Sequence, residues 1–212
     1  MNNPTATIVD YGVGNMMSVT SAIDVVGGTP TMSNDEDIIA KADRLILPGV
    51  GAFKDAMNDM HASGLVEPVR EFAKSGRPIL GICLGAQMLL STSEEFGLHQ
   101  GLDLIKGSVI KIPDVDTDGD QQRIPHVGWQ SLNAVNNWNS TVLDGLKPGV
   151  DVYFVHSLHP VPDDPDDVYG SCQYGGHTIN GTIGHDNIWG CQFHPEKSAT
   201  SGLAILRNFL QM

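Results

Sequence analysis

Residues 78–90 of the chain read PILGICLGAQMLL, an apolar run that stops at a cysteine between two glycines. Gly81 and Gly85 stand two residues before and two residues after Cys83, and residues that favour a helix follow at once. This is the G-x-S-x-G spacing of a nucleophile elbow, with cysteine in place of serine. The glycines permit a tight turn, so the spacing predicts that a strand ends here and a helix begins.

Such a turn would present the Cys83 side chain at the carboxyl edge of a sheet. The N-terminus of the following helix favours the thiolate, which is the nucleophilic form of cysteine. The next backbone amide, that of Leu84, would point to the place where an oxyanion develops. A lone free cysteine is more often a small buried hydrophobe, and on the spacing alone this interpretation stays open for Cys83.

A nucleophile of this kind needs a base and a group that orients the base. The sequence CQFHPEKS at residues 191–198 places His194 after a strand-like run and Glu196 two residues later. Pro195 favours an extended conformation at His194, in which residues 194 and 196 can project toward the same side. A single histidine is more often structural than catalytic, but the nearby carboxylate distinguishes His194 from the other seven histidines.

The composition argues against several classes of function. The 212 residues include 25 acidic and 12 basic side chains, a formal net charge of -13 that repels nucleic-acid phosphates and anionic lipid. No apolar run approaches the roughly 20 residues of a membrane span, and no secretory signal is visible. We therefore expect a cytoplasmic protein that binds neither nucleic acid nor membrane. Cys172 and Cys191 are interpreted as packing residues rather than as part of a disulfide or zinc site.

Two segments resemble ligand-binding motifs but lack a required residue. The acidic stretch DVDTDGD at residues 114–120 begins like a calcium-binding loop, yet Pro125 stands where that loop needs a glutamate. We expect a solvated loop and no metal site. The early DYGVGN starts like a dinucleotide-binding turn, but Met17 replaces the third glycine. We expect no nucleotide there.

The order of predicted elements indicates one α/β domain over residues 1–212. Strands are predicted at residues 5–12, 29–33, 44–53 and 78–82, and helices at residues 15–26, 35–42, 52–63 and 65–74. This alternation predicts a mostly parallel sheet with helices on both faces. Later strand candidates follow one another closely, with little helix between them, and therefore predict an antiparallel annex. They lie at residues 102–112, 126–132, 152–158, 169–176, 177–184 and 188–193, before a final helix at residues 200–211.

The joint occurrence of LGICLGAQ and, about a hundred residues later, QFHPE resembles the class I glutamine amidotransferases. The segments IVDYGVGNMMSV, LILPGVGAF, IPHVGWQ, YFVHS and QFHPEKSATSGLAILRNFL resemble one branch of that family, the glutaminase subunits of imidazole glycerol phosphate synthases. The resemblance covers essentially the whole chain. It implies a flavodoxin-like, three-layer α/β fold without a cofactor. It also implies hydrolysis of L-glutamine to glutamate and ammonia through a cysteine thioester.

In that branch the ammonia passes to a (β/α)8 synthase subunit, which forms imidazole glycerol phosphate and an aminoimidazole carboxamide ribonucleotide. By this resemblance Cys83 attacks the side-chain amide of glutamine, His194 transfers protons and Glu196 orients His194. The segment PGVG at residues 48–51 resembles the oxyanion strand of the family. The positions that match substrate-binding positions of the family are Gly49, Val50, Gly51, Leu84, Gln87, His156, Ser157 and Leu158.

Departures from the family pattern leave the partner open. The chain has PHVGWQ where the family reads PHMGWN, and Leu158 and His159 stand where an aromatic residue is common. None of these departures touches Cys83, His194 or Glu196. One alternative is a paralogous glutaminase that supplies ammonia to a sugar-modifying amidotransferase of surface polysaccharide synthesis. Others are a stand-alone cysteine γ-glutamyl hydrolase and a binding module that has lost catalysis, which the intact triad argues against.

Overall fold

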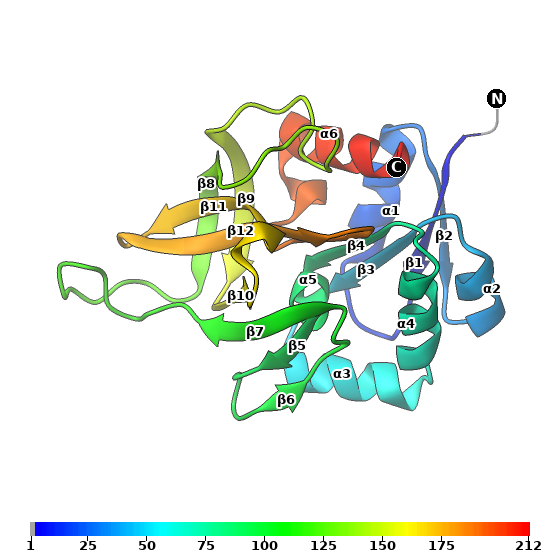
Figure 1. The fold of residues 1–212 in the computed structure, drawn as a ribbon, viewed down its shortest axis with the longest axis horizontal. Helices are drawn as coiled ribbons and strands as arrows, with labels where there is room; N and C mark the ends of the chain where they lie inside the picture. The colour runs from blue at the N-terminus through cyan, green and yellow to red at the C-terminus, as the bar shows by residue number, and fades with distance from the viewer. Residues whose placement is uncertain (1–2) are drawn as a thin grey trace.

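The computed structural model describes residues 3–212, and its centre is a nine-stranded sheet of order β2-β1-β3-β4-β13-β12-β11-β8-β9 (Figure 1). The strands on the parallel side pair in the order β2, β1, β3, β4 and β13. The remaining strands pair antiparallel. The bounds are β1 (Thr5–Val9), β2 (Thr29–Ser33), β3 (Leu45–Gly49), β4 (Ile79–Cys83), β8 (His126–Ala134), β9 (Val150–His156), β11 (Val168–Tyr174), β12 (His177–His185) and β13 (Ile188–Cys191).

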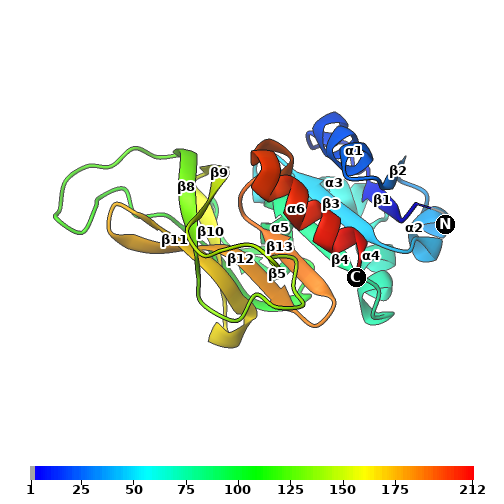
Figure 2. The same cartoon turned by 90° about the horizontal axis from the view of Figure 1, so that it is seen from above.

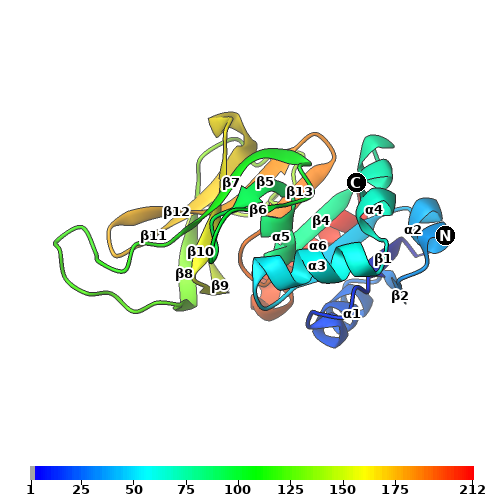
Figure 3. The ribbon, with the colours of Figure 1, turned by 90° about the horizontal axis from the view of Figure 1, so that it is seen from below.

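Helices cover both faces of the parallel half. Its inner strands β3 and β4 are therefore buried along their whole length. One face packs against α2 (Glu36–Lys41), α3 (Phe53–Ala62) and α4 (Val66–Lys74), with Phe53 and Phe72 in its core. Figure 3 shows α3 and α4 in front of this face. The other face packs against α1 (Met16–Val25) and α6 (Ala199–Leu210), which lie in front in Figure 2. The predicted three-layer α/β arrangement is therefore confirmed.

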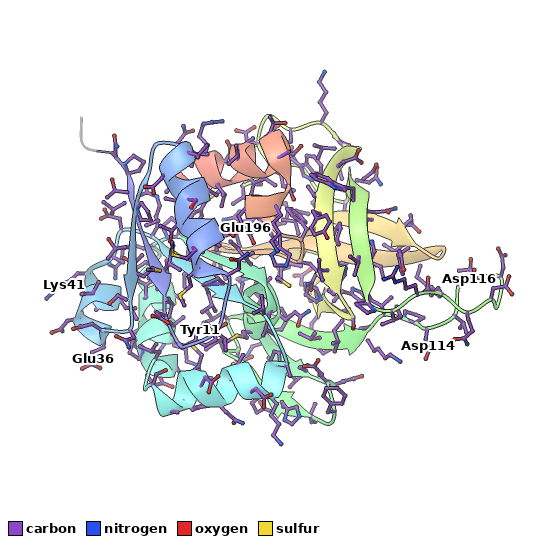
Figure 4. All side chains as sticks on the ribbon, turned by 180° about the vertical axis from the view of Figure 1, so that it is seen from behind. Tyr11, Glu36, Lys41, Asp114, Asp116 and Glu196 are labelled. Atoms are coloured by element: carbon purple, nitrogen blue, oxygen red, sulfur yellow. The ribbon has the colours of Figure 1, made fainter. Side chains whose placement is uncertain are left out.

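A second, four-stranded sheet of order β10-β7-β5-β6 extends the antiparallel part. Its strands are β5 (Leu90–Ser93), β6 (His99–Gln100), β7 (Ile105–Lys111) and β10 (Leu158–Pro162). Two short 3-10 helices, η1 (Pro165–Asp167) and η2 (Pro195–Lys197), complete the elements. The acidic segment between β7 and β8 projects away from both sheets, with Asp114 closer to β7 and Asp116 farther out (Figures 1 and 4).

The helices predicted in the first half are all present, within one or two residues of their predicted ends. The helix after Cys83 is shorter than the sequence suggested. It is α5 (Leu84–Met88), and strand β5 begins at Leu90. Leu90 pairs with Ile105 of β7, and this long-range pairing outweighs the helical preference of the leucines. Among residues 3–212, no helix is both long and apolar enough to cross a membrane.

Candidate active site

Cys83 is the last residue of β4 and stands at a sharp turn into α5. Its φ of 55° and ψ of -112° form a conformation that a non-glycine residue adopts only under strain. The flanking glycines make this turn possible. A Cβ at Gly81 would lie 2.7 Å from backbone atoms of Ala86, and a Cβ at Gly85 would overlap the carbonyl oxygen of Leu47. The helix therefore packs directly onto β3 and β4 only because both positions lack a side chain.

The PGVG segment lies beside this turn, because Gly49 pairs with Cys83 in the register of β3 and β4. A Cβ at Gly49 would lie 2.8 Å from the amide nitrogen of Gly85 and 2.9 Å from Cβ of Leu84. Val50 is exposed, and Gly51 has a φ of 97°, which favours glycine. The two backbone segments that the sequence assigned to oxyanion binding are thus neighbours.

A buried tyrosine holds the start of the PGVG segment. The hydroxyl of Tyr11, which follows β1, donates a hydrogen bond of 2.6 Å to the carbonyl oxygen of Pro48. Burial raises the pKa of Tyr11, and the negative charges of Cys83 and Asp59 raise it further, so the hydroxyl stays a neutral donor. Figure 4 labels Tyr11 within the core. The sequence analysis missed this residue.

His194 and Glu196 form a buried pair, and His194 lies close to the Cys83 sulfur. Nδ1 of His194 lies 2.8 Å from Oε1 of Glu196, and the Glu196 side chain is only 1% exposed. His194 is extended, with a φ of -99° and a ψ of 97°, as the following proline favours. Its amide donates to the carbonyl of Tyr153, and Ser198 Oγ donates to its carbonyl at 2.7 Å. Figure 4 shows Glu196 beside α1 and α6.

The surroundings of His194 favour its charged form. Burial opposes the charge, but hydrogen bonds and charge interactions with Cys83 and Glu196 outweigh it and raise the pKa of His194 to about 9. A protonated imidazole next to a cysteine sulfur stabilises the thiolate, which is the nucleophilic form. By contrast, burial raises the pKa of the Cys172 thiol to about 12 and raises that of Cys191 as well. Those two cysteines are unsuited to attack.

Three of the remaining predicted substrate residues, Gln87, His156 and Leu158, share one hydrogen-bond network. Gln87 is buried and donates through Nε2 to the carbonyl oxygen of Leu158 at 3.0 Å. Nδ1 of His156 lies 2.8 Å from the same oxygen. Ser157 is half-buried, and its carbonyl accepts from the amide of Ile112. Nε2 of Gln87 and both ring nitrogens of His156 are therefore occupied by protein partners.

Three residues of this region were not assigned by sequence reasoning: Tyr11, Gln192 and Ser198. Gln192 lies within the quoted QFHPE motif and is fully buried, with Nε2 3.9 Å from Cys83 Sγ. Its place inside the motif was the available signal. Tyr11 and Ser198 also lie within quoted segments, but their hydrogen bonds to the backbone of Pro48 and Tyr153 join residues far apart in the chain and have no local signal.

The arrangement of an elbow cysteine, a histidine and a carboxylate agrees with a comparison to protein families. The family model described as Glutamine amidotransferase class-I matches residues 7–212. The chain belongs to this family.

Curated relatives narrow the similarity further. The chain is 44% identical over 211 residues to "Imidazole glycerol phosphate synthase subunit HisH 1" of Legionella pneumophila (strain Paris), which covers 98% of this chain and 99% of the relative. It is 45% identical over 206 residues to the subunit HisH of Syntrophotalea carbinolica, covering 97% and 98%. The chain thus resembles HisH subunits from end to end.

Solved structures share the fold at low sequence identity. The structure of PurLQS from Thermotoga maritima matches with a TM-score of 0.72 and 18% identity, covering 99% of this chain and 98% of that one. A crystal structure of a glutamine amidotransferase matches with a TM-score of 0.71 and 18% identity, covering 97% of each chain. These matches support the architecture alone.

Proposed function

We propose that the protein is the glutaminase subunit of an imidazole glycerol phosphate synthase. The observation that carries the proposal is the His194–Glu196 pair, joined at 2.8 Å, beside the strained Cys83 elbow. End-to-end similarity of 41–45% to relatives named HisH supports the particular enzyme. The substrate is L-glutamine, which the chain converts to glutamate and ammonia.

The reaction begins when Sγ of Cys83 attacks the side-chain carbonyl carbon of glutamine. The amides of Leu84 and of the segment at residues 49–51 stabilise the oxyanion. The C–N bond breaks as His194 gives a proton to the leaving nitrogen, which departs as ammonia and leaves a γ-glutamyl thioester. Water then attacks the thioester, and His194 accepts its proton. Glutamate leaves and the sulfur is regenerated, while Glu196 keeps the imidazole oriented and supports its charge.

The segments that border the sulfur bind the different groups of the substrate. Gly49, Val50 and Gly51 supply backbone for the oxyanion side. The backbone of His156, Ser157 and Leu158 lines the side that holds the α-amino and α-carboxylate groups. Gln87, which donates to the carbonyl of Leu158, borders the same side of the site.

The ammonia passes to a (β/α)8 synthase subunit, with which the chain forms a heterodimer. Direct transfer matters because ammonium, the form that dominates in neutral water, is no nucleophile. The chain works as a single cytoplasmic domain over residues 1–212. With 25 acidic and 12 basic residues, the chain disfavours nucleic acid and membrane surfaces as partners but does not exclude a basic protein.

Coupling to the partner runs through the PGVG segment. A peptide next to glycine can turn its amide away from the oxyanion site and back again for about 1–3 kcal/mol of strain. A partner that supplies this energy only when its own substrate is bound prevents the waste of glutamine. One oxyanion donor is worth about 10² to 10³ in rate, so partner loading should stimulate hydrolysis by at least that factor.

The test is glutamine hydrolysis by the chain alone, with the barrel subunit, and with the barrel subunit plus its nucleotide ligand. The proposal expects little activity alone and strong stimulation in the loaded complex. Full activity in the isolated chain would instead identify a stand-alone γ-glutamyl hydrolase. Stimulation only by a sugar-modifying amidotransferase would identify the paralogous glutaminase.

A further inference from the structure

Gln192 has no role in the mechanism above, yet its side chain lies between Cys83 and Gln87. It follows β13 directly and is fully buried. Its Oε1 lies 2.9 Å from Gln87 Nε2, and its Nε2 lies 3.9 Å from Cys83 Sγ. A buried amide whose two ends meet a fixed partner and a reactive sulfur calls for a functional explanation.

The direction of these hydrogen bonds is fixed at a backbone carbonyl. The oxygen of Leu158 can only accept, so the atom of Gln87 that lies 3.0 Å from it must be the NH₂ nitrogen. The second hydrogen of that nitrogen then donates to Gln192, so the facing atom of Gln192 must be its oxygen. The NH₂ group of Gln192 is therefore turned toward Cys83, since the hydrogen-bond network determines the orientation of an amide.

The same carbonyl anchors the other half of the network. Nδ1 of His156 must donate to the Leu158 oxygen at 2.8 Å. Burial lowers the pKa of His156 to about 3, so its Nε2 is a neutral acceptor, and Nδ1 of His126 donates to it at 3.1 Å. His126 in turn stacks on Tyr174, with ring centroids 4.1 Å apart. The chain of donors and acceptors is complete, which holds Gln87 and Gln192 in one arrangement.

We infer that Gln192 donates a hydrogen bond to the Cys83 thiolate and that Gln87 is the positioning residue that aims it. A thiolate is a stronger acceptor than a thiol, so the bond favours the ionised sulfur and lowers the pH at which Cys83 becomes nucleophilic. Gln87 then serves the nucleophile through Gln192, in addition to any contact with glutamine. The inference rests on the proposed function of Cys83 as nucleophile.

Other titratable groups also face the sulfur and must stay unchanged in a test. They are His194, with Glu196 behind it, and Tyr11 after β1. His156 on β9 joins the same network through the Leu158 oxygen and also stays unchanged. Strand β13 adds only Cys191, which burial keeps as a neutral thiol, while β3 and α5 carry no titratable side chain. Replacing Gln192 by an uncharged residue leaves all of these in place.

The experiment measures the rate at which iodoacetamide alkylates Cys83 in the isolated chain as a function of pH, with the labelled peptide identified by mass spectrometry. Gln192→Met keeps the length of the side chain but has no donor. We expect the pH midpoint to rise by about one unit, which is about tenfold less labelling at a pH below both midpoints. Gln87→Met should shift the midpoint in the same direction by less. An unchanged midpoint in Gln192→Met would overturn the inference.

A control variant tests whether the shift is specific to Gln192, and a second variant serves if Gln192→Met does not fold. Thr182→Val alters another fully buried polar side chain, one whose hydroxyl has no hydrogen-bond partner among the described residues, in the strand next to β13. We expect no shift of the midpoint. If Gln192→Met does not fold, Gln192→Glu still accepts from Gln87 but places a negative charge near Sγ. It should raise the midpoint further, and a wild-type midpoint in that variant also overturns the inference.

The readout separates this inference from the proposed function, because alkylation needs neither glutamine nor a partner. Glutamine hydrolysis that survives in Cys83→Ala would end the proposed function, while the alkylation midpoints would still decide the role of Gln192. Conversely, normal partner-stimulated hydrolysis with an unshifted midpoint in Gln192→Met would leave the proposed function standing and end the inference.

Discussion

At the scale of the residue, the elbow depends on strain that its neighbours impose. Cys83 has a positive φ that costs on the order of 1–3 kcal/mol, and it keeps this conformation because β4 and α5 are both packed against β3. The result places Sγ within reach of the carbonyl of Val155, at 3.8 Å, and of Gln192. Cys172 and Cys191 have ordinary strand conformations inside the sheet and lack such neighbours.

The first prediction concerns the nucleophile. Cys83→Ala should abolish glutamine hydrolysis by the assembled complex, because burial raises the pKa of the Cys172 and Cys191 thiols and keeps them neutral. Synthesis from added ammonium salt should survive, since it does not need the thioester. Cys172→Ala is the matched control and should remain active. Labelling of Cys172 or Cys191 by a glutamine-like electrophile, with Cys83 unlabelled, would contradict the assignment.

The second prediction separates the base from its orienting carboxylate. His194→Asn should lower glutaminase activity by several orders of magnitude, since general acid–base catalysis alone contributes about 10² to 10⁴. Glu196→Gln should be milder, because its Oε1 can still accept from Nδ1 while only the charge is lost. The other oxygen of Glu196 is buried without a hydrogen-bond partner among the described residues, so the amide breaks no further bond. Equal losses in the two variants would show that Glu196 does more than orient His194.

At the scale of the element, local pattern predicted most of the parallel half. The alternation of apolar runs with Gly and Pro breaks predicted β2, β4 and α1 to α4 within one or two residues of their observed ends. The segments predicted for β1 and β3, residues 5–12 and 44–53, also include the turn and the loop that end these strands. It missed the two-residue strand β6, which pairs with its neighbour β5 in the chain. It also missed β5 and β10, which are short and exist through pairing with the more distant β7. Pairing over such separations leaves no local signal in the sequence.

The same limit applies to the site. The sequence predicted Cys83, His194 and Glu196 as site residues because the elbow turn and the His194–Glu196 pair arise from the local G-x-C-x-G and H-P-E spacings. Gln192 and Tyr11 were not found, since their contacts join residues 105 and 37 positions apart in the chain. Residue type and spacing can indicate a reactive group, but the groups that support it are set by how the sheet brings separate strands together.

The third prediction tests the contact between elements at the elbow. Gly85→Ala places a Cβ against the carbonyl oxygen of Leu47, a backbone atom that cannot move without shifting β3. We expect a loss in the free energy of unfolding of about 1–3 kcal/mol or more, with loss of glutaminase activity. Gly64→Ala is the control. Its Cβ meets nothing within 4 Å, so only its φ of 72° costs energy, about 1 kcal/mol. Equal destabilisation, measured by denaturant unfolding, would contradict the role of close packing.

At the scale of the whole molecule, the buried histidines have pKa values shifted in opposite directions, so they affect stability in different pH ranges. Burial lowers the pKa of His156 to about 3 and that of His159 to about 4, whereas Cys83 and Glu196 raise that of His194 to about 9 against the effect of its burial. The contribution of His194 to stability is complete below about pH 6.5 and is lost as pH rises through 9. The other two contribute fully above pH 6.5 and lose their contribution as pH falls toward their folded values.

The last prediction follows from that division. Between pH 7 and pH 5, His156 and His159 become protonated in the unfolded chain but stay mostly neutral in the folded protein. The free energy of unfolding should therefore fall. At pH 5 the value of about 4 for His159 corresponds to a loss of about 2 kcal/mol, at about 1.4 kcal/mol for each unit below 6.5. His159→Gln should remove this part of the difference between the two pH values, whatever its effect on stability at pH 7. The exposed His61→Gln is the control and should leave the difference unchanged. Urea unfolding of the three proteins at both pH values decides the matter, and an undiminished pH dependence in His159→Gln would contradict the assignment.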